Sequence, residues 1–173
     1  TVNEKALENF RRGNFQIIPD LPHAGMNLVR GQSRGDLRYL RESLEMLIEL
    51  GDDELLHMYP VPEDIGNPII YQHKGYRYTF RWLRQIRMLS VFRKYLKGSL
   101  GERPICMDIG SGWGLFSYLI AQEIPQSTNV LVDFPEMLML AHYFIKMSFP
   151  EARIATYVDL CHTDSIDREL LQG

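Results

Sequence analysis

The chain has few of the residues and patterns that mark specialised protein classes. It contains only two cysteines in 173 residues, Cys106 and Cys161, and they lack the spacing of a metal site or a disulfide framework. No run approaches the ~18 apolar residues of a membrane-spanning helix, and the polar segment 1–14 does not resemble a signal peptide. We therefore expect a reduced, cytoplasmic globular protein without a membrane partner. The net charge of −3 argues against a general nucleic-acid binder.

Glycine is concentrated in the segment 104–114, which reads PICMDIGSGWG. The apolar residues 105–109 predict a buried strand, and the helical spacing of apolar residues in 115–123 predicts a helix. Between them lie three glycines at alternate positions, Gly110, Gly112 and Gly114. Glycine permits positive φ and close approach of a ligand to the backbone, and a helix N-terminus binds anions. The segment therefore predicts a cofactor loop.

Two residues indicate which cofactor this loop binds. The dinucleotide fingerprint requires a third glycine at the position that Leu115 occupies. Asp108, at the end of the strand, would repel a pyrophosphate but attract the α-ammonium group of S-adenosylmethionine. Trp113 is either an aromatic partner for the sulfonium or a packing residue. We expect S-adenosylmethionine as the cofactor, and an NAD(P)-dependent oxidoreductase is the alternative.

A second acid, Asp133, follows the next apolar segment. Residues 129–132 predict a strand, and Asp133 comes directly after it. A carboxylate at this place accepts hydrogen bonds from ribose hydroxyls in nucleotide-binding folds. Asp133 is therefore a candidate ribose ligand, although it could instead cap the helix that we expect to begin at Pro135.

A third apolar segment, residues 153–158, predicts another strand that ends at Asp159, a candidate cofactor contact. The segment that follows also contains His162, Asp164 and Asp167. These side chains could suggest a hard-metal site, but we favour turn and cap residues and predict no metal.

The sequences DIGSGWG (108–114) and VDFPEMLMLAHYFI (132–145) resemble motif I and the second strand and helix of class I S-adenosylmethionine-dependent methyltransferases. The chain is most similar to bacterial sugar O-methyltransferases, through its helical N-terminal region, the segment 63–68 and the basic helix before motif I. The resemblance implies an α/β, Rossmann-like fold, a parallel sheet with flanking helices. The expected cofactor-binding residues are Asp108, Gly110, Ser111, Gly112, Gly114, Asp133 and Asp159.

The resemblance also implies a reaction, the transfer of a methyl group to a hydroxyl oxygen of a sugar or related small molecule. Such a transfer needs the acceptor oxygen and the methyl carbon aligned at about 3 Å, and a group that removes a proton. No catalytic base can be assigned. Candidates for sugar stacking, or equally for packing, are Tyr71, His73, Tyr76 and Tyr78. The alternative function is a non-catalytic, methyltransferase-like binding or oligomerisation module.

The chain divides by pattern into a mostly helical region, 1–100, and the first half of a cofactor-binding domain, 101–173. In the first region we expect an amphipathic start (1–12), a connector (13–31) and a helix (35–50). A short helix, capped by Asp52 and Asp53 and ending near His57, follows. A long loop (59–75) and a basic helix (77–97) complete the region.

The basic helix 77–97 carries seven basic residues and no acid. Three interpretations remain open: a solvated face with ion pairs to the acids between Glu42 and Asp53, an RNA-binding surface, or a contact with an anionic glycan or sugar nucleotide. We favour the solvated face with ion pairs. For the protein as a whole we expect a small-molecule or glycan acceptor as the binding partner.

Residues 105–173 suffice for three parallel strands and two crossover helices, about half of a doubly wound domain. We therefore expect a domain truncated after the third strand. The strand 105–109 would then have an exposed edge, to be covered by a C-terminal half or by another copy of the chain. The chain alone should bind the cofactor weakly at most and transfer no methyl group.

Overall fold

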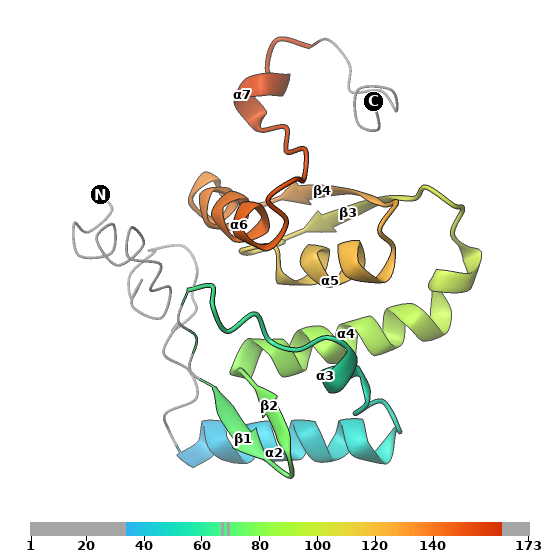
Figure 1. The fold of residues 1–173 in the computed structure, drawn as a ribbon, viewed down its shortest axis with the longest axis vertical. Coiled ribbons are helices and arrows are strands. Elements are labelled where there is room, and N and C mark those ends of the chain that lie inside the picture. The colour runs from blue at the N-terminus through green and yellow to red at the C-terminus, as the bar shows by residue number, and fades with distance from the viewer. Residues whose placement is uncertain (1–33, 67, 69, 164–173) are drawn as a thin grey trace, which may run out of the picture. The chain divides into compact units, whose positions relative to one another are not determined.

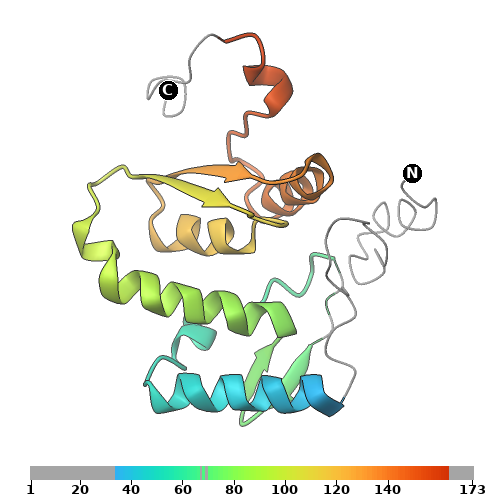
Figure 2. The same ribbon diagram turned by 180° about the vertical axis from the view of Figure 1, so that it is seen from behind.

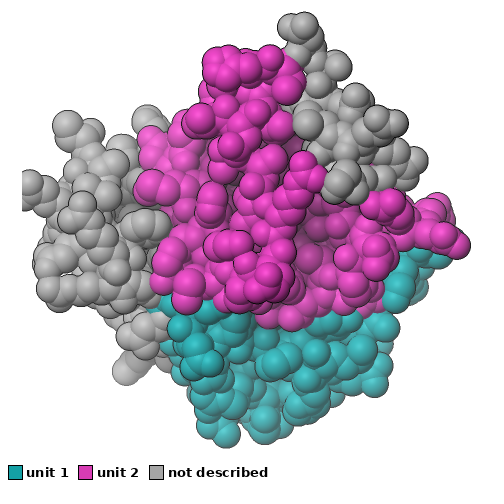
Figure 3. All heavy atoms as spheres, turned by 45° about the horizontal axis from the view of Figure 1, so that its top comes forward, with its two compact units in different colours: residues 1–98 teal, residues 99–173 magenta. Residues whose placement is uncertain are grey.

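The computed structural model describes residues 34–66, 68 and 70–163. These residues form a mixed α/β structure with helices, a small antiparallel sheet and a small parallel sheet (Figure 1). The chain forms two compact units, residues 1–98 and 99–173, which Figure 3 distinguishes by colour.

Several expected features lie outside the described residues: the amphipathic start 1–12, the connector 13–31, Asp164 and Asp167. Within the described ranges, no helix is both long enough and apolar enough to cross a membrane.

Helix α2 (Arg34–Glu49) confirms the helix expected at 35–50. Its buried face is a leucine stripe formed by Leu40, Leu44 and Leu47. The helix ends at Glu49, and Gly51 follows with a left-handed φ of 71° and an N–H that donates to the carbonyl of Ile48 at 3.0 Å. Glycine is the usual residue at this position because it has no Cβ to clash in the left-handed conformation.

Helix α4 (Phe80–Tyr95) confirms the basic helix, although it begins three residues later than expected. It begins after Thr79, whose side-chain oxygen accepts a hydrogen bond from the N–H of Trp82 at 3.0 Å. The indole N–H of Trp82 donates to the carbonyl of Tyr59 at 3.0 Å. The buried face packs against α2 and contains Trp82, Leu83, Ile86, Leu89 and Phe92. A short 3₁₀ helix, η2 (Lys97–Ser99), follows.

The expectation that 59–75 is an irregular loop is wrong at its end, because β1 (Tyr71–His73) and β2 (Tyr76–Tyr78) form an antiparallel hairpin. Its two-residue turn contains Lys74 (φ 49°) and Gly75 (φ 85°), both left-handed as a type I′ turn requires. The overlooked signal was a Lys-Gly pair between alternating aromatic residues.

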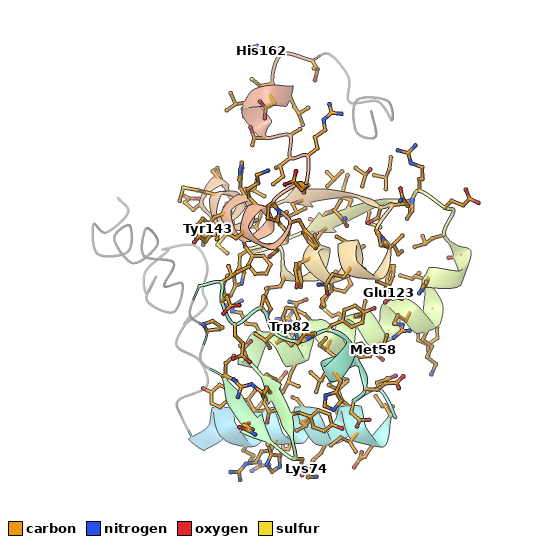
Figure 4. All side chains as sticks on the ribbon, viewed as in Figure 1. Met58, Lys74, Trp82, Glu123, Tyr143 and His162 are labelled. Carbon is orange, nitrogen blue, oxygen red and sulfur yellow. The ribbon has the colours of Figure 1, made fainter. Side chains whose placement is uncertain are left out.

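Because Lys74 is a non-glycine residue in the left-handed region, Lys74→Asn should raise the free energy of unfolding by about 0.5–1 kcal/mol. Lys74 lies at the hairpin tip (Figure 4), and its ammonium group lies 3.5 Å from the exposed carboxylate of Glu45, a pair that contributes little. Urea denaturation of both proteins measures the difference. A loss of stability in the variant would show that the ion pair outweighs the turn.

The short helix α3 (Leu55–Met58) is present, but Asp52 and Asp53 do not cap it with their side chains. Its N-cap is Glu54, which makes no side-chain cap bond. Asp52 instead accepts a hydrogen bond from the hydroxyl of Ser90 on α4. Asp53 accepts one from the hydroxyl of Tyr76, which raises the pKa of that phenol. The two acids therefore connect the turn before α3 to α4 and to the hairpin.

The second unit contains the parallel pair β3 (Ile105–Ile109) and β4 (Thr128–Val132), with Asp108 opposite Leu131. Helix α5 (Leu115–Glu123) connects the two strands and lies along one face of the pair (Figures 1 and 2). Helix α6 (Pro135–Ser148) follows β4. These four elements confirm the expected strand-loop-helix-strand-helix order.

The third strand expected at 153–158 is wrong. Residues 152–156 pair with no strand, and the chain then forms the short helix α7 (Tyr157–Leu160). The carboxylate of Asp159 accepts hydrogen bonds from the N–H and the hydroxyl of Thr156, both at 2.7 Å. This local arrangement is typical of a helix start, and it outweighs the strand propensity of a short segment.

The expectation that 105–109 is a buried strand is wrong for one face of β3, which is apolar and exposed. Asp108 points toward α5, because it accepts a hydrogen bond from Ser117 on that helix. Side chains of a strand alternate between faces, so Ile105, Met107 and Ile109 lie on the opposite face, and Ile109 is 77% exposed. Within the described residues β3 pairs with β4 alone, so its other edge carries no strand.

Candidate cofactor site

The expected cofactor loop lies between the end of β3 and the first turn of α5. All three of its glycines have left-handed backbone angles, with φ of 76° at Gly110, 57° at Gly112 and 79° at Gly114. A side chain at any of them would be strained, since L residues rarely adopt these angles. The loop conformation itself thus accounts for the three glycines.

The glycines differ in what surrounds them. A Cβ atom on Gly110 would meet no atom within 4 Å, and one on Gly112 would meet only the terminal methyl of Met137 at 3.9 Å. A Cβ on Gly114 would lie 3.1 Å from a methyl carbon of Leu131. Gly114 therefore permits close packing between the start of α5 and β4, whereas Gly110 and Gly112 leave open space beside the backbone.

The loop is held by hydrogen bonds to the end of β4. The N–H groups of Gly110 and Ser111 both donate to the carbonyl of Val132, at 2.8 and 3.4 Å. The N–H of Gly114 donates to the carbonyl of Ser111 at 3.0 Å, which closes a turn within the loop. The glycine loop and the end of β4 thus form one hydrogen-bonded unit.

Asp133 completes this unit. One of its carboxylate oxygens accepts from the N–H of Gly112 at 2.6 Å, and the other accepts from the N–H of Phe134 at 2.7 Å. Phe134, not Asp133, is the N-cap residue of α6 and makes no side-chain cap bond. A carboxylate has about four lone-pair sites, so Asp133 keeps acceptor capacity on both oxygens for a further donor.

Asp108 is half-buried at the end of β3, and one of its carboxylate oxygens accepts a hydrogen bond from the hydroxyl of Ser117 at 3.0 Å. Ser117 is a buried residue of α5 that sequence reasoning missed. A polar residue within the apolar helix LFSYLI was the available signal. Its hydroxyl orients Asp108 and leaves the second carboxylate oxygen without a hydrogen bond from the described residues.

Ser111 has a buried hydroxyl oxygen with no hydrogen-bond partner among the described residues. An unsatisfied buried polar group costs about 1–3 kcal/mol, so such groups are uncommon in folded proteins. Its position in the middle of the glycine loop fits a loop that completes its hydrogen bonding with a polar ligand.

Trp113 packs within the second unit. Its ring lies 6.4 Å, centre to centre, from that of Phe144 on α6, which in turn lies 5.3 Å from Tyr118 on α5. Burial raises the pKa of the Tyr118 phenol. These contacts favour the packing interpretation of Trp113 over a sulfonium contact.

Asp159 does not lie at a strand end. It is an exposed residue of α7, and its pKa is lowered because its carboxylate accepts hydrogen bonds from Thr156. Its assignment to the cofactor thus loses the strand argument and stays a prediction. The described part of the chain contains no group of three or more His, Cys, Asp or Glu side chains placed to hold a metal ion.

The aromatic residues proposed for sugar contact belong to the first unit, in the hairpin. Tyr78 is only 2% exposed, which raises its pKa and makes it a core residue. The ring of Tyr76 lies 4.9 Å from that of His57. Burial of Tyr78 and the ring contact of Tyr76 favour packing for these two residues, while a sugar contact by Tyr71 or His73 stays a prediction.

Comparison of the chain with protein-family models, with curated protein sequences and with solved structures gave no significant match.

Proposed function

We propose that the chain binds S-adenosylmethionine and acts in methyl transfer to a hydroxyl oxygen of a sugar or related small molecule. The observation that carries the proposal is the hydrogen bond from the N–H of Gly112 to Asp133. It joins a left-handed glycine loop after one parallel strand to an acid after the neighbouring strand. In α/β sheets, nucleotide ligands bind at these carboxyl ends. The proposal implies that the second unit belongs to a Rossmann-like methyltransferase domain.

Each of these groups would bind a different part of the cofactor. Asp108 would hold the α-ammonium group with the oxygen that Ser117 leaves available. The N-terminus of α5 would face the carboxylate of the cofactor's methionine part, because the helix dipole and the free N–H groups favour negative charge there. Asp133 would accept hydrogen bonds from the ribose hydroxyls while it retains the Gly112 N–H. When bound, the cofactor supplies an electrophilic methyl group.

The loop disfavours a pyrophosphate ligand. Leu115 occupies the place of the third glycine of a dinucleotide fingerprint, and its side chain is buried. Asp108 adds negative charge at the strand end, where a pyrophosphate would be repelled. An NAD(P)-dependent oxidoreductase is therefore the weaker alternative. The sugar acceptor rests on the sequence resemblance alone, and a non-catalytic binding module would share the same cofactor site.

The assignment of Asp108 is tested with two ligands. Asp108→Asn should weaken binding of S-adenosylhomocysteine about tenfold, because it removes a charge-assisted bond to the ammonium group. It should leave binding of 5′-methylthioadenosine unchanged, because that nucleoside lacks the amino-acid part. Isothermal titration calorimetry of wild type and variant gives the ratio of their dissociation constants for each ligand.

Ser117→Ala is the matched control, since it removes the partner of Asp108 but keeps the carboxylate. Ser117→Ala should lose less affinity for S-adenosylhomocysteine than Asp108→Asn does. Equal losses of both ligands in Asp108→Asn would mean that Asp108 acts on the loop, not on the ammonium group. Unchanged affinity for both ligands would remove Asp108 from the site.

A further inference from the structure

Helix α4 has an exposed face that its packing within the first unit does not use. The apolar side chains of Met88, Val91 and Tyr95 lie along this face, with Val91 51% and Tyr95 66% exposed. Arg87 and Lys94, two helical turns apart, lie along one edge of it, and both are exposed. Helix α4 contains no acid to balance them. We call this face the basic strip.

The expected ion pairs between this helix and the acids of the 42–53 region do not account for the basic strip. Glu42 pairs with Arg38 at 2.7 Å, and Glu45 pairs with Lys74 at 3.5 Å. Asp52 and Asp53 accept hydrogen bonds from hydroxyl groups. In the described part of the chain, no ion pair involves Arg87 or Lys94, and Lys94 instead lies 5.3 Å from the ring centre of Tyr95.

Helix α2 has an exposed face of the opposite charge. Tyr39 (48% exposed) and Met46 (39%) form its apolar part, and Glu42 and Glu49 lie along one edge, also two turns apart. We call this face the acidic strip. The spacing of seven residues is the same in both strips, about 10.5 Å along each helix. Two acids of one strip can therefore meet two bases of the other at the same time.

The handedness of the two strips fixes how they can meet. At 100° per residue, the charges lie on the same side of the apolar line in both helices when each is viewed from its N-terminus. Charges on matching edges face each other only when the helices run antiparallel. Apolar residues in the centre with charges at the rim are also the usual composition of a protein–protein interface.

We propose that the basic strip of one copy of this chain binds the acidic strip of a second copy, with α4 and α2 antiparallel. Charge complementarity favours a second copy as the partner, since the same chain carries both halves of the pattern. Because the two strips are different surfaces, the contact is heterologous, and it adds further copies unless a ring closes. Arg38, which pairs with Glu42, competes weakly because that pair is exposed.

Sedimentation of the 173-residue chain over a range of concentrations tests this proposal. The wild type should self-associate at low salt and dissociate as the salt concentration rises from about 50 to about 500 mM, which shortens the screening length. Arg87→Glu with Lys94→Glu should weaken self-association at least about tenfold, as should Glu42→Lys with Glu49→Lys.

Complementation provides the control. Each double variant should lose the salt-dependent self-association and keep the melting temperature of the wild-type monomer, since all four residues are exposed. A mixture of the two variants should associate again, because each reversed strip then meets a strip of opposite charge. A monomeric wild type, or variants that associate as well as the wild type, would overturn the proposal.

Binding of an anionic polymer would identify a different ligand of the basic strip. If the wild type is monomeric but binds a sulfated oligosaccharide or poly(U), and Arg87→Glu with Lys94→Glu abolishes this binding, the basic strip is an anion-binding surface. Self-association would then be excluded.

Discussion

Gly114→Ala is expected to lower the free energy of unfolding by about 2–4 kcal/mol. The new Cβ would sit at a left-handed φ of 79° and only 3.1 Å from a methyl carbon of Leu131. Backbone strain and overpacking thus act together, because the packed side chain of Leu131 would have to shift to make room for the new methyl group. Chemical denaturation of wild type and variant measures the loss.

Gly110→Ala is the matched control for this prediction. Its φ of 76° is nearly the same, but its Cβ would meet no atom within 4 Å. It should therefore cost only the backbone strain, about 1–2 kcal/mol. If both substitutions destabilise the protein equally, Gly114 is not a packing position and the contact between α5 and β4 is looser than described.

Asp133→Ala is expected to weaken binding of S-adenosylhomocysteine roughly 10- to 150-fold, which corresponds to about 1.5–3 kcal/mol. The carboxylate is the proposed ribose ligand, so 5′-methylthioadenosine should lose affinity by a similar factor. This shared loss distinguishes Asp133 from Asp108, whose substitution should affect only the ligand with an ammonium group. Calorimetric titrations with the two ligands measure both factors.

Asp133 also holds the glycine loop, so its two roles must be separated. Asp133→Asn keeps one acceptor oxygen for the N–H of Gly112, 2.6 Å away in the wild type, but cannot accept with both oxygens. It should retain more stability than Asp133→Ala and still bind the nucleoside poorly. Wild-type affinity in a folded Asp133→Asn protein would restrict Asp133 to support of the loop.

Local sequence predicted the helices α2 and α4 and most of the cofactor-loop unit. β3, α5, β4 and the start of α6 follow from apolar spacing, glycine and proline, which act within a few residues. The hairpin was missed because Pro60, Pro62 and Pro68 dominated the interpretation of the segment before it. Its Lys-Gly turn was weaker than the usual Asn-Gly signal.

The third strand failed for a different reason. Residues 153–158 carry a strand-like pattern, but a parallel strand depends on a distant partner for its hydrogen bonds. Thr156 and Asp159 supply a competing arrangement within four residues. The local capping interaction therefore determined the structure of this segment, and the strand pairing that the sequence suggested did not form.

In the candidate site, too, local features were predicted from the sequence and contacts between elements were not. Sequence placed Asp108 and Asp133 at the ends of neighbouring strands, and the structure has them there. It could not predict that Asp133 binds the N–H of Gly112 or that Ser117 orients Asp108, because both contacts depend on how the loop and α5 lie against the strands.

Calorimetric titration of the wild-type chain with S-adenosylhomocysteine and, separately, with NADH tests the central claim most directly. Asp108, the buried Leu115 and the Gly112–Asp133 bond predict that the homocysteine product binds and that NADH does not. Tighter binding of NADH than of S-adenosylhomocysteine, or no binding of S-adenosylhomocysteine to the folded chain, would contradict the proposed cofactor site.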